Sequence, residues 1–540
     1  MNDLRLALEM LYKTARKAKI NMANQTLFQT LRGAFVPTAT AVNSHNAPAY
    51  SLAPKQALAQ YAATGCFNRT FYATATDQLG RVTELCEGLD PKFVAQTAVY
   101  TRENAYMKDM PAFLCAWLSS RDARLHEAVF AKVIDNARML RSYVQILRSG
   151  VVGRKSLGTA PKRLVKAWLQ NHAEESIFRA SAGQNPSITD VLKMVHPKPD
   201  SPQRDAFYGY MLGRGYDPAA LPKLVSDFEK FKSGESLDVP DVPFLLLASM
   251  LSRKDWAQVA RQASWQTLRM NLNTFARHGV FEDAVLTRQL ADRLRDPQEV
   301  AKARVFPYQL LAAYQNCDTE TVPVLLRDAL QDAMELAIAN VPSIAGTVVV
   351  CPDVSGSMQS PVTGQRGVGA TSRVRCIDVA ALVAAAFLRK NPGSTVVMPF
   401  EEQVVKLELN GRDSVMTNAA KLAKVGGGGT NCSAPMQKMN YLGTKADLVV
   451  YVSDNESWVD AGNGRGTALM AEWMKFRRRN SQARLVCLDI QPNATTQAVE
   501  RADVLNIGGF SDAVFEVISA FASGRLEADH WVAQIEKVAV

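Results

Sequence analysis

The amino-acid sequence predicts a chain of two parts, an all-α half followed by a doubly wound α/β half. Residues 55–340 carry apolar side chains at three- and four-residue steps, the period of helices buried along one face. After residue 342 the pattern changes to short runs of β-branched residues separated by helical segments. Such runs are typical of a parallel sheet covered on both faces. We therefore predict a multidomain chain, with an all-α domain over residues 1–343 and an α/β domain over residues 344–540.

The first half is a series of short helices punctuated by glycine and proline. Trp265, Leu268, Leu272 and Phe275 form one apolar stripe, and similar stripes run through residues 123–149, 161–171, 218–232 and 320–340. Short helices with short connections fit an antiparallel stack of helix pairs, as in a solenoid. The sequence shows no crisp internal repeat.

The second half alternates strands and helices. We expect strands over residues 347–351, 395–400, 448–452, 484–488 and 504–507, and a helix over residues 375–389. The boundary between the two halves falls near Ser343. Because ligands of a doubly wound sheet gather beyond the carboxyl ends of its strands, we expect functional residues there.

The composition is that of an ordinary globular protein, with 47% hydrophobic and 21% charged residues. The longest apolar run, residues 379–388, is far shorter than the roughly 20 residues that cross a bilayer, so we expect no membrane partner. The first residues lack the apolar core of a secretory signal. Eight cysteines are widely spread without a Cys-x-x-Cys pair, which favours reduced core thiols and a cytoplasmic protein.

Positive charge is concentrated in the first half. Residues 1–345 contain 42 Lys and Arg against 33 Asp and Glu, whereas residues 346–540 contain 20 against 19. No acid lies between Asp135 and Glu174, and a second stretch without acids spans residues 261–277. Such a surface attracts a polyanion by counterion release, although a solvated helical face is the alternative. The candidate contacts are Arg138, Arg141, Arg154, Lys155, Lys162, Arg163, Lys166, Arg261 and Arg269.

Hydroxyl and carboxylate side chains follow two predicted strands and one glycine-rich loop. Asp353, Ser355 and Ser357 have the spacing D-x-S-x-S, Thr430 follows four glycines, and Asp454 follows the strand at 448–452. Oxygen ligands without His or Cys suit a hard cation, and we predict Mg²⁺. The alternative is a loop in which Ser and Asp only cap turns. The site offers no nucleophile with a histidine beside it, so we do not expect an enzyme.

These three segments resemble the metal-ion-dependent adhesion site of the von Willebrand factor A family. The resemblance implies that Ser355, Ser357 and Thr430 bind the cation directly, while Asp353 and Asp454 act through water. It also implies a vacant coordination position that accepts an acidic oxygen from a partner.

Both halves together resemble the bacterial form of the Ro autoantigen family, the TROVE-domain RNA-binding proteins, over nearly the whole chain. The resemblance rests on Asp353-Val354-Ser355-Gly356-Ser357-Met358, Gly428-Gly429-Thr430-Asn431-Cys432-Ser433, Ser453-Asp454-Asn455-Glu456-Ser457, Leu268-Arg269-Met270-Asn271-Leu272 and a basic stretch from Lys162 to Pro199. It implies a ring of HEAT-like repeats closed by the A-type domain, with a basic hole for single-stranded 3′ ends of misfolded RNAs. It further implies an outer surface for small non-coding Y RNAs, and an exoribonuclease partner such as polynucleotide phosphorylase in RNA quality control. We expect a monomer.

One position departs from the family pattern. Family members carry a histidine that contributes to Y RNA binding where this chain has Ile188, which puts fine recognition of a Y-type RNA in doubt. His196 matches another family position and is a candidate RNA contact, with helix-end capping as the alternative. Trp168 is interpreted as a core residue rather than a platform for stacked bases.

Three hypotheses about function remain open at the level of sequence. The first is a non-catalytic RNA-binding ring whose basic helices contact phosphates. The second is a protein-interaction adaptor in which the metal-dependent A-type domain is the working module and the basic surface only aids solubility. The third, a metal-dependent nuclease or phosphatase, fits least well, because such sites gather several carboxylates and this one offers two.

Overall fold

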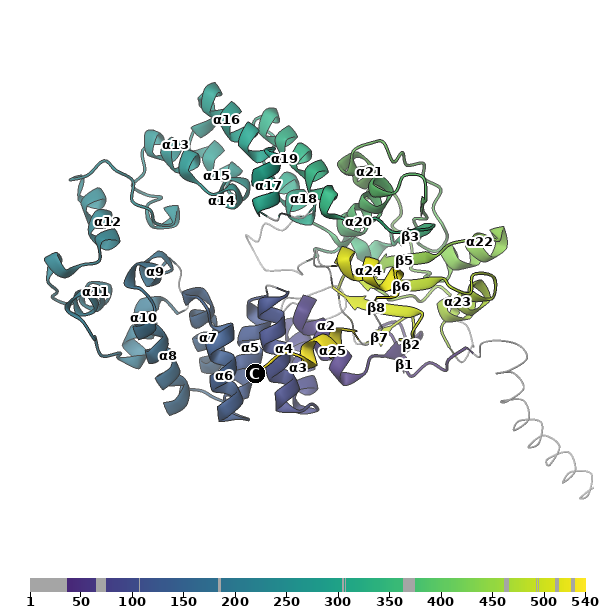
Figure 1. The fold of residues 1–540 in the computed structure, drawn as a ribbon, viewed down its shortest axis with the longest axis horizontal. Helices are drawn as coiled ribbons and strands as arrows, with labels where there is room; N and C mark the ends of the chain where they lie inside the picture. Colours follow the sequence, from purple (N-terminus) through teal and green to yellow (C-terminus); the bar gives the residue numbers. More distant parts are fainter. Residues whose placement is uncertain are drawn as a thin grey trace, which may run out of the picture.

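The computed structural model describes residues 36–64, 74–105, 107–182, 186–303, 305, 307–362, 374–460, 466–491, 493, 495–509, 514–525 and 530–540. Within these residues the chain forms a closed circuit of helices that begins and ends at a mixed sheet-and-helix module (Figure 1). None of the described helices is long and apolar enough to span a bilayer.

The first run of helices has a core of its own. Each of these helices buries an apolar stripe against its neighbours, and one cluster of buried side chains includes residues from all of them. The helices are α2 (Pro54–Thr64), α3 (Ala75–Glu87), α4 (Pro91–Glu103), α5 (Asp109–Leu118), α6 (Ala123–Val133), α7 (Ala137–Ser149), α8 (Thr159–Asn171), α9 (Glu174–Arg179), α10 (Ile188–Val195), α11 (Pro202–Leu212) and α12 (Lys223–Ser233).

The second run of helices shares its core with the sheet. These helices are α13 (Arg253–Gln262), α14 (Trp265–Met270), α15 (Leu272–Arg277), α16 (Ala284–Leu294), α17 (Pro297–Ala303), α18 (Pro307–Asn316) and α19 (Val324–Ala337). Their buried side chains form one cluster with one face of the sheet, because α18 and α19 pack against α20 (Cys376–Lys390) and α21 (Val415–Leu422). Leu251, in the connection between α12 and α13, packs against both core clusters.

The sheet is parallel, as the sequence predicts, and its five strands lie in the order β4-β3-β5-β6-β8. The strands are β3 (Val348–Pro352), β4 (Thr395–Val397), β5 (Leu448–Ser453), β6 (Arg484–Asp489) and β8 (Val504–Gly508). Side chains alternate between faces, so Val348 and Val350 face α20 and α24 (Val514–Ala522), whereas Val349 and Cys351 join a separate cluster. That cluster includes α22 (Ala434–Leu442) and α23 (Ala468–Arg479). The sheet is therefore covered on both faces.

The two ends of the chain cross between the halves, which the sequence did not predict. The short strands β1 (Ala41–Val42) and β2 (Pro48–Ser51) form a hairpin that pairs with β7 (Thr495–Thr496) of the sheet module. In the opposite direction, α25 (His530–Glu536) packs on α2 and α4. The helix α2 also contacts β8 and so closes the circuit. Packing therefore does not follow the predicted division at residue 343 near either terminus.

Candidate metal centre and basic surface

Three loops meet at the carboxyl ends of β3 and β5. The strands are neighbours in the sheet, so the loops that follow them start side by side. The glycine-rich loop at 426–429 joins the loop after β3 through two backbone hydrogen bonds, from Gly427 N to Val354 O at 2.9 Å and from Gly356 N to Gly428 O at 2.9 Å. Gly426 has φ of 87°, and a Cβ there would clash with the carbonyl oxygen of Val354. Only glycine allows this approach.

Asp353 is the centre of the hydrogen-bond network in these loops. Its Oδ1 accepts from the backbone N–H of Ser355 at 2.8 Å, and its Oδ2 accepts from the Ser453 hydroxyl at 2.6 Å. The hydroxyl oxygens of Ser355 and Ser357 lie 3.3 Å apart. The three predicted side chains of the D-x-S-x-S loop are thus brought together, and all three are buried.

The other two predicted ligands lie in the loops that meet this one. Thr430 and Asp454 are 2% and 3% exposed. The backbone of Thr430 accepts hydrogen bonds from Trp458 and Val459, which fixes the glycine-rich loop against the loop after β5. The side-chain amide of Asn493 donates to the carbonyl oxygen of Asp454 at 2.7 Å.

The electrostatics of the site favour a bound cation. Burial and the neighbouring Asp454 raise the pKa of Asp353 to about 7, and burial also raises the pKa of Asp454. Ionising both carboxyl groups without a cation is unfavourable, because they are buried and repel one another. A divalent cation between them would stabilise the doubly ionised form. Two carboxylates and three hydroxyls are oxygen ligands of the kind that Mg²⁺ prefers. The residues present therefore fit a hard cation.

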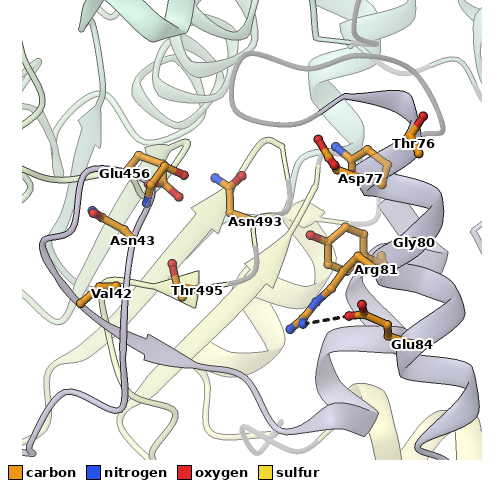
Figure 2. Close-up of a pocket in the computed structure, with 13 residues that line it drawn as sticks. Val42, Asn43, Thr76, Asp77, Gly80, Arg81, Glu84, Glu456, Asn493 and Thr495 are labelled. Atoms are coloured by element: carbon orange, nitrogen blue, oxygen red, sulfur yellow. Dashed lines mark hydrogen bonds and ion pairs between the residues drawn. The ribbon is translucent and has the colours of Figure 1, made fainter.

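Residues of the turn between β1 and β2 form hydrogen bonds with the loop after β5. The side-chain amide of Asn43 donates to the carbonyl oxygen of Ser457 at 2.6 Å, and the backbone N–H of Ser44 donates to Glu456 at 2.9 Å. A cavity of about 520 Å³ opens beside this contact. In Figure 2, Glu456, Asn493 and Thr495 line one side of the cavity, while Arg81 and Glu84 of α3 line the other.

Sequence reasoning missed this contribution of the hairpin. Glu456 belongs to the segment Ser453–Ser457 after β5, so the sequence could have indicated that it lies near the site. Asn43 had none, because it precedes the site by several hundred residues and only the fold brings it there.

The α7 arginines form a stripe in which Arg138 and Arg148 are exposed and Arg141 is partly buried. Met139, Tyr143 and Leu147 face the core, which leaves positions 138, 141 and 148 on the other side of the helix. Among the described residues, Arg138, Arg141 and Arg148 make no ion pair, and Nε of Arg141 has no acceptor. Burial, Arg138 and Arg102 lower the pKa of Lys108, the residue before α5, against the opposing effect of Asp109 and Asp135. Lys108 therefore lies close to Arg138.

The other basic residues between Asp135 and Glu174 are of two kinds: some face solvent, and others make contacts that stabilise the fold. Lys155 is exposed, and Lys162 and Lys166 are partly exposed without an ion pair in the described part of the chain. Arg163 forms a 2.8 Å ion pair with Glu127 of α6. The guanidinium of Arg154 donates to the carbonyl oxygen of Ser119, so Arg154 fastens the loop after α7. The basic residues between Asp135 and Glu174 therefore differ in exposure and pairing, although the sequence indicates one continuous cationic surface.

The other three candidates are placed differently. Arg269 is only 8% exposed, lies over the Trp265 ring, and donates to the carbonyl oxygen of Gln309 at 2.5 Å. This placement gives no support to a phosphate contact by Arg269. Arg261 is exposed and 3.7 Å from Asp283. The backbone N–H of His196 caps α10 in the left-handed conformation while its side chain is exposed.

Two further sequence interpretations can be checked. Trp168 is 6% exposed, donates to the carbonyl oxygen of Ile134 at 2.6 Å and stacks on His172, so it is a core residue as predicted. Ile188 is fully buried at the start of α10. Seven of the eight cysteines are buried free thiols, which agrees with the prediction, and Cys66 lies outside the described residues.

Comparison with known proteins agrees with the fold and the family resemblance. The family model of the Ro60 vWA domain matches residues 347–522. The chain is 24% identical over 517 residues to the RNA-binding protein RO60 of Deinococcus radiodurans, covering 88% of this chain and 94% of that protein. It is 23% identical over 250 residues to the RNA-binding protein RO60 of Caenorhabditis elegans, covering 44% of this chain and 37% of that one.

A solved structure extends the likeness to the whole fold. The crystal structure of the Deinococcus radiodurans RO (RSR) protein superposes with a TM-score of 0.59 at 21% identity, covering 88% of this chain and 100% of that one. The predicted resemblance to the bacterial Ro proteins is therefore confirmed, as is the fold class of a helical-repeat part followed by a von Willebrand factor A-type domain.

Proposed function

We propose that this protein is a non-catalytic RNA-binding protein. The observation that carries the proposal is the α7 stripe of Arg138, Arg141 and Arg148, which forms no ion pair among the described residues. Asp190 is near enough to Arg148 for that charge to help lower its pKa. Three cations on one helix, with Lys108 near Arg138, attract phosphates whatever the base sequence. The relatives from Deinococcus radiodurans and Caenorhabditis elegans, both named RNA-binding proteins, support the same conclusion.

The finer role that we propose follows the family resemblance. The ring accepts single-stranded 3′ ends of misfolded RNAs, the outer surface binds a small Y-type RNA, and an exoribonuclease such as polynucleotide phosphorylase degrades or trims the RNA. The protein acts as a monomer in the cytoplasm. Ile188 is buried where the family has a contacting histidine, so binding of a Y-type RNA here relies on the neighbouring cations.

We further propose that the loops after β3 and β5 bind Mg²⁺. Ser355, Ser357 and Thr430 would hold the ion directly, and Asp353 and Asp454 would act through water. The support is the convergence of these side chains and the raised pKa of Asp353 without a cation. A bound cation supplies a position for an acidic oxygen of a partner, and no chemical step on RNA is assigned to it.

The direct test is binding of a single-stranded RNA to the full chain at several salt concentrations. We expect affinity to fall steeply and linearly in log–log form as salt rises. Binding that is absent at low salt would overturn the proposed function.

A second candidate function is a metal-dependent protein-interaction adaptor. Trp458 and Val459, which donate to the Thr430 carbonyl at the metal loops, are 43% and 38% exposed. Exposed apolar side chains beside a cation site favour a protein ligand. Mg²⁺-dependent capture of one protein by a chain that binds no RNA would support this alternative.

A further inference from the structure

Two adjoining cavities lie between the α14–α15 segment and α18, outside the metal site and the α7 stripe. They have volumes of about 540 and 490 Å³, and Asn273, Asn316 and Cys317 line both of them. We refer to the pair as the amide groove. In Figure 1, α14 and α18 lie along the edge of their stack that faces the centre of the circuit of helices.

The walls of the amide groove carry an unusual number of carboxamide side chains. Gln266, Asn273, Gln309, Gln315 and Asn316 all line it. The amide oxygens of Gln309 and Gln315 are buried and accept no hydrogen bond from the described residues. A buried acceptor without a donor is unfavourable, so each is a position where a bound N–H group would be stabilised.

The groove is held rigid by its own contacts. The side chain of Asn273 donates to the carbonyl oxygen of Asn316 at 2.7 Å and accepts from the backbone N–H of Asp318 at 2.9 Å. The Arg269 guanidinium lies along the groove wall. It donates to the side-chain oxygen of Gln266 at 2.9 Å and to the carbonyl oxygen of Gln309 at 2.5 Å. Gln309 and Gln315 therefore line a groove whose neighbouring side chains are already fixed by hydrogen bonds.

The rim offers groups that bind the rest of a nucleotide. Tyr308 and Tyr314 line the groove and are partly buried against the core beneath it. Aromatic side chains in such a position are groups on which an unpaired base can stack. Met270 lies at the other side and is 70% exposed. Arg277 is exposed and makes no ion pair in the described part of the chain, so its charge remains open to a phosphate.

From this juxtaposition we propose that the amide groove binds unpaired nucleobases that carry an exocyclic amino group, with adenine the best match. The amino group donates to the amide oxygen of Gln309 or Gln315, and the amide N–H of the same side chain donates to a ring nitrogen. A glutamine forms this pair of bonds with adenine. Uracil has no exocyclic amino group. The inference rests on the proposed function and adds base selectivity to it.

The test uses nine-nucleotide oligomers of adenosine, uridine and purine riboside, which lacks the amino group. We expect the wild-type chain to bind the adenosine oligomer about tenfold more tightly than the other two, within the roughly fivefold to 150-fold discrimination of a good bidentate contact. The double variant Gln309→Met and Gln315→Met is expected to bind all three alike. Gln262→Met, an exposed position on α13, is the matched control and should keep the preference.

The outcomes separate the two proposals. If the wild-type chain binds no oligomer at low salt, RNA binding itself fails. If it binds all three oligomers equally and with steep salt dependence, RNA binding stands and the amide groove inference is overturned. The purine riboside comparison uses the wild-type chain alone, so the inference stays testable if the double variant does not fold.

Discussion

The Ser453 hydroxyl donates a 2.6 Å hydrogen bond to Oδ2 of Asp353 and thereby joins the end of β5 to the loop after β3. Both side chains are completely buried. The bond orients one carboxylate oxygen, while the backbone N–H of Ser355 orients the other. Asp353 is therefore fixed before any ligand arrives, and Asp454 lies close enough to raise its pKa.

Magnesium should stabilise the wild-type protein against unfolding. At a free Mg²⁺ concentration one hundred times the dissociation constant, binding to the folded state adds about 2.7 kcal/mol to the free energy of unfolding. Thermal melts with Mg²⁺ and with EDTA measure this gain. Asp454→Ala should abolish the gain, whereas Asp413→Ala, which breaks an ion pair with Lys421 and is outside the predicted ligand set, should retain it. Equal melting temperatures with and without Mg²⁺ in the wild type would exclude the metal site.

Without a divalent cation, stability should fall as pH rises through neutrality. The pKa of Asp353 in the folded chain is about 7, above the ordinary 3.8, so the folded state holds this proton more tightly than the unfolded state. The resulting stabilisation is complete below about pH 4 and is lost as pH rises through about 7. Denaturant unfolding in EDTA at pH 5 and pH 8 checks it. The profile of Asp353→Asn should be flatter.

The same pKa predicts how magnesium binding depends on pH. Because a proton on Asp353 competes with the cation, the Mg²⁺-induced rise in melting temperature should be larger at pH 8 than at pH 5.5. A larger rise at the lower pH would contradict the role of Asp353.

Neutralising the α7 stripe should flatten the salt dependence of RNA binding. Each phosphate contact on a single strand contributes about 0.7 to the log–log slope, so Arg138→Gln, Arg141→Gln and Arg148→Gln together should reduce it by about 2. The control replaces Lys223, Lys232 and Arg253 by Gln, since these cations are already ion-paired and the change in net charge is the same. An equal decrease of the slope in both triple variants would show that the α7 stripe acts only through the net charge of the protein and makes no specific phosphate contact.

The α8 cluster should contribute less than its sequence indicates. Arg163 is paired with Glu127, so the triple change of Lys162, Arg163 and Lys166 to Gln should remove about two contacts and lower the slope by about 1.4. Glu127→Gln would release Arg163, and we expect it to strengthen RNA binding slightly. An unchanged slope in the triple variant would remove α8 from the RNA surface.

The C-terminal helix should be essential to the stability of the first helices. Ile535 is 1% exposed in their core, and the side-chain amide of Gln96 donates to the carbonyl oxygens of Glu536 and Val538. Ile535→Ala should lower the free energy of unfolding by about 2–5 kcal/mol. Lys537→Ala, at an exposed neighbouring position, is the control. A change below about 0.5 kcal/mol at Ile535, the range of neutral surface substitutions, would show that α25 does not support this core.

The sequence by itself determined the elements and the metal loops. The runs at 448–452 and 484–488 fall within β5 and β6, and the predicted helix at 375–389 differs from α20 by one residue at each end. Asp353, Ser355 and Ser357 could be predicted to converge with Thr430 and Asp454 because parallel strands end at one edge of a sheet. Such features depend on local periodicity and on one topological rule.

Only the tertiary structure decided which charges are available and what each terminus contacts. Arg163 and Lys162 are adjacent in the same helix, yet only Arg163 meets a carboxylate, from α6. Arg269 looked like a surface cation and is buried against Trp265. The crossing of β1, β2 and α25 and the unpaired amides of Gln309 and Gln315 had no sequence signal. The partner of a side chain is set by long-range packing, which a local pattern does not encode.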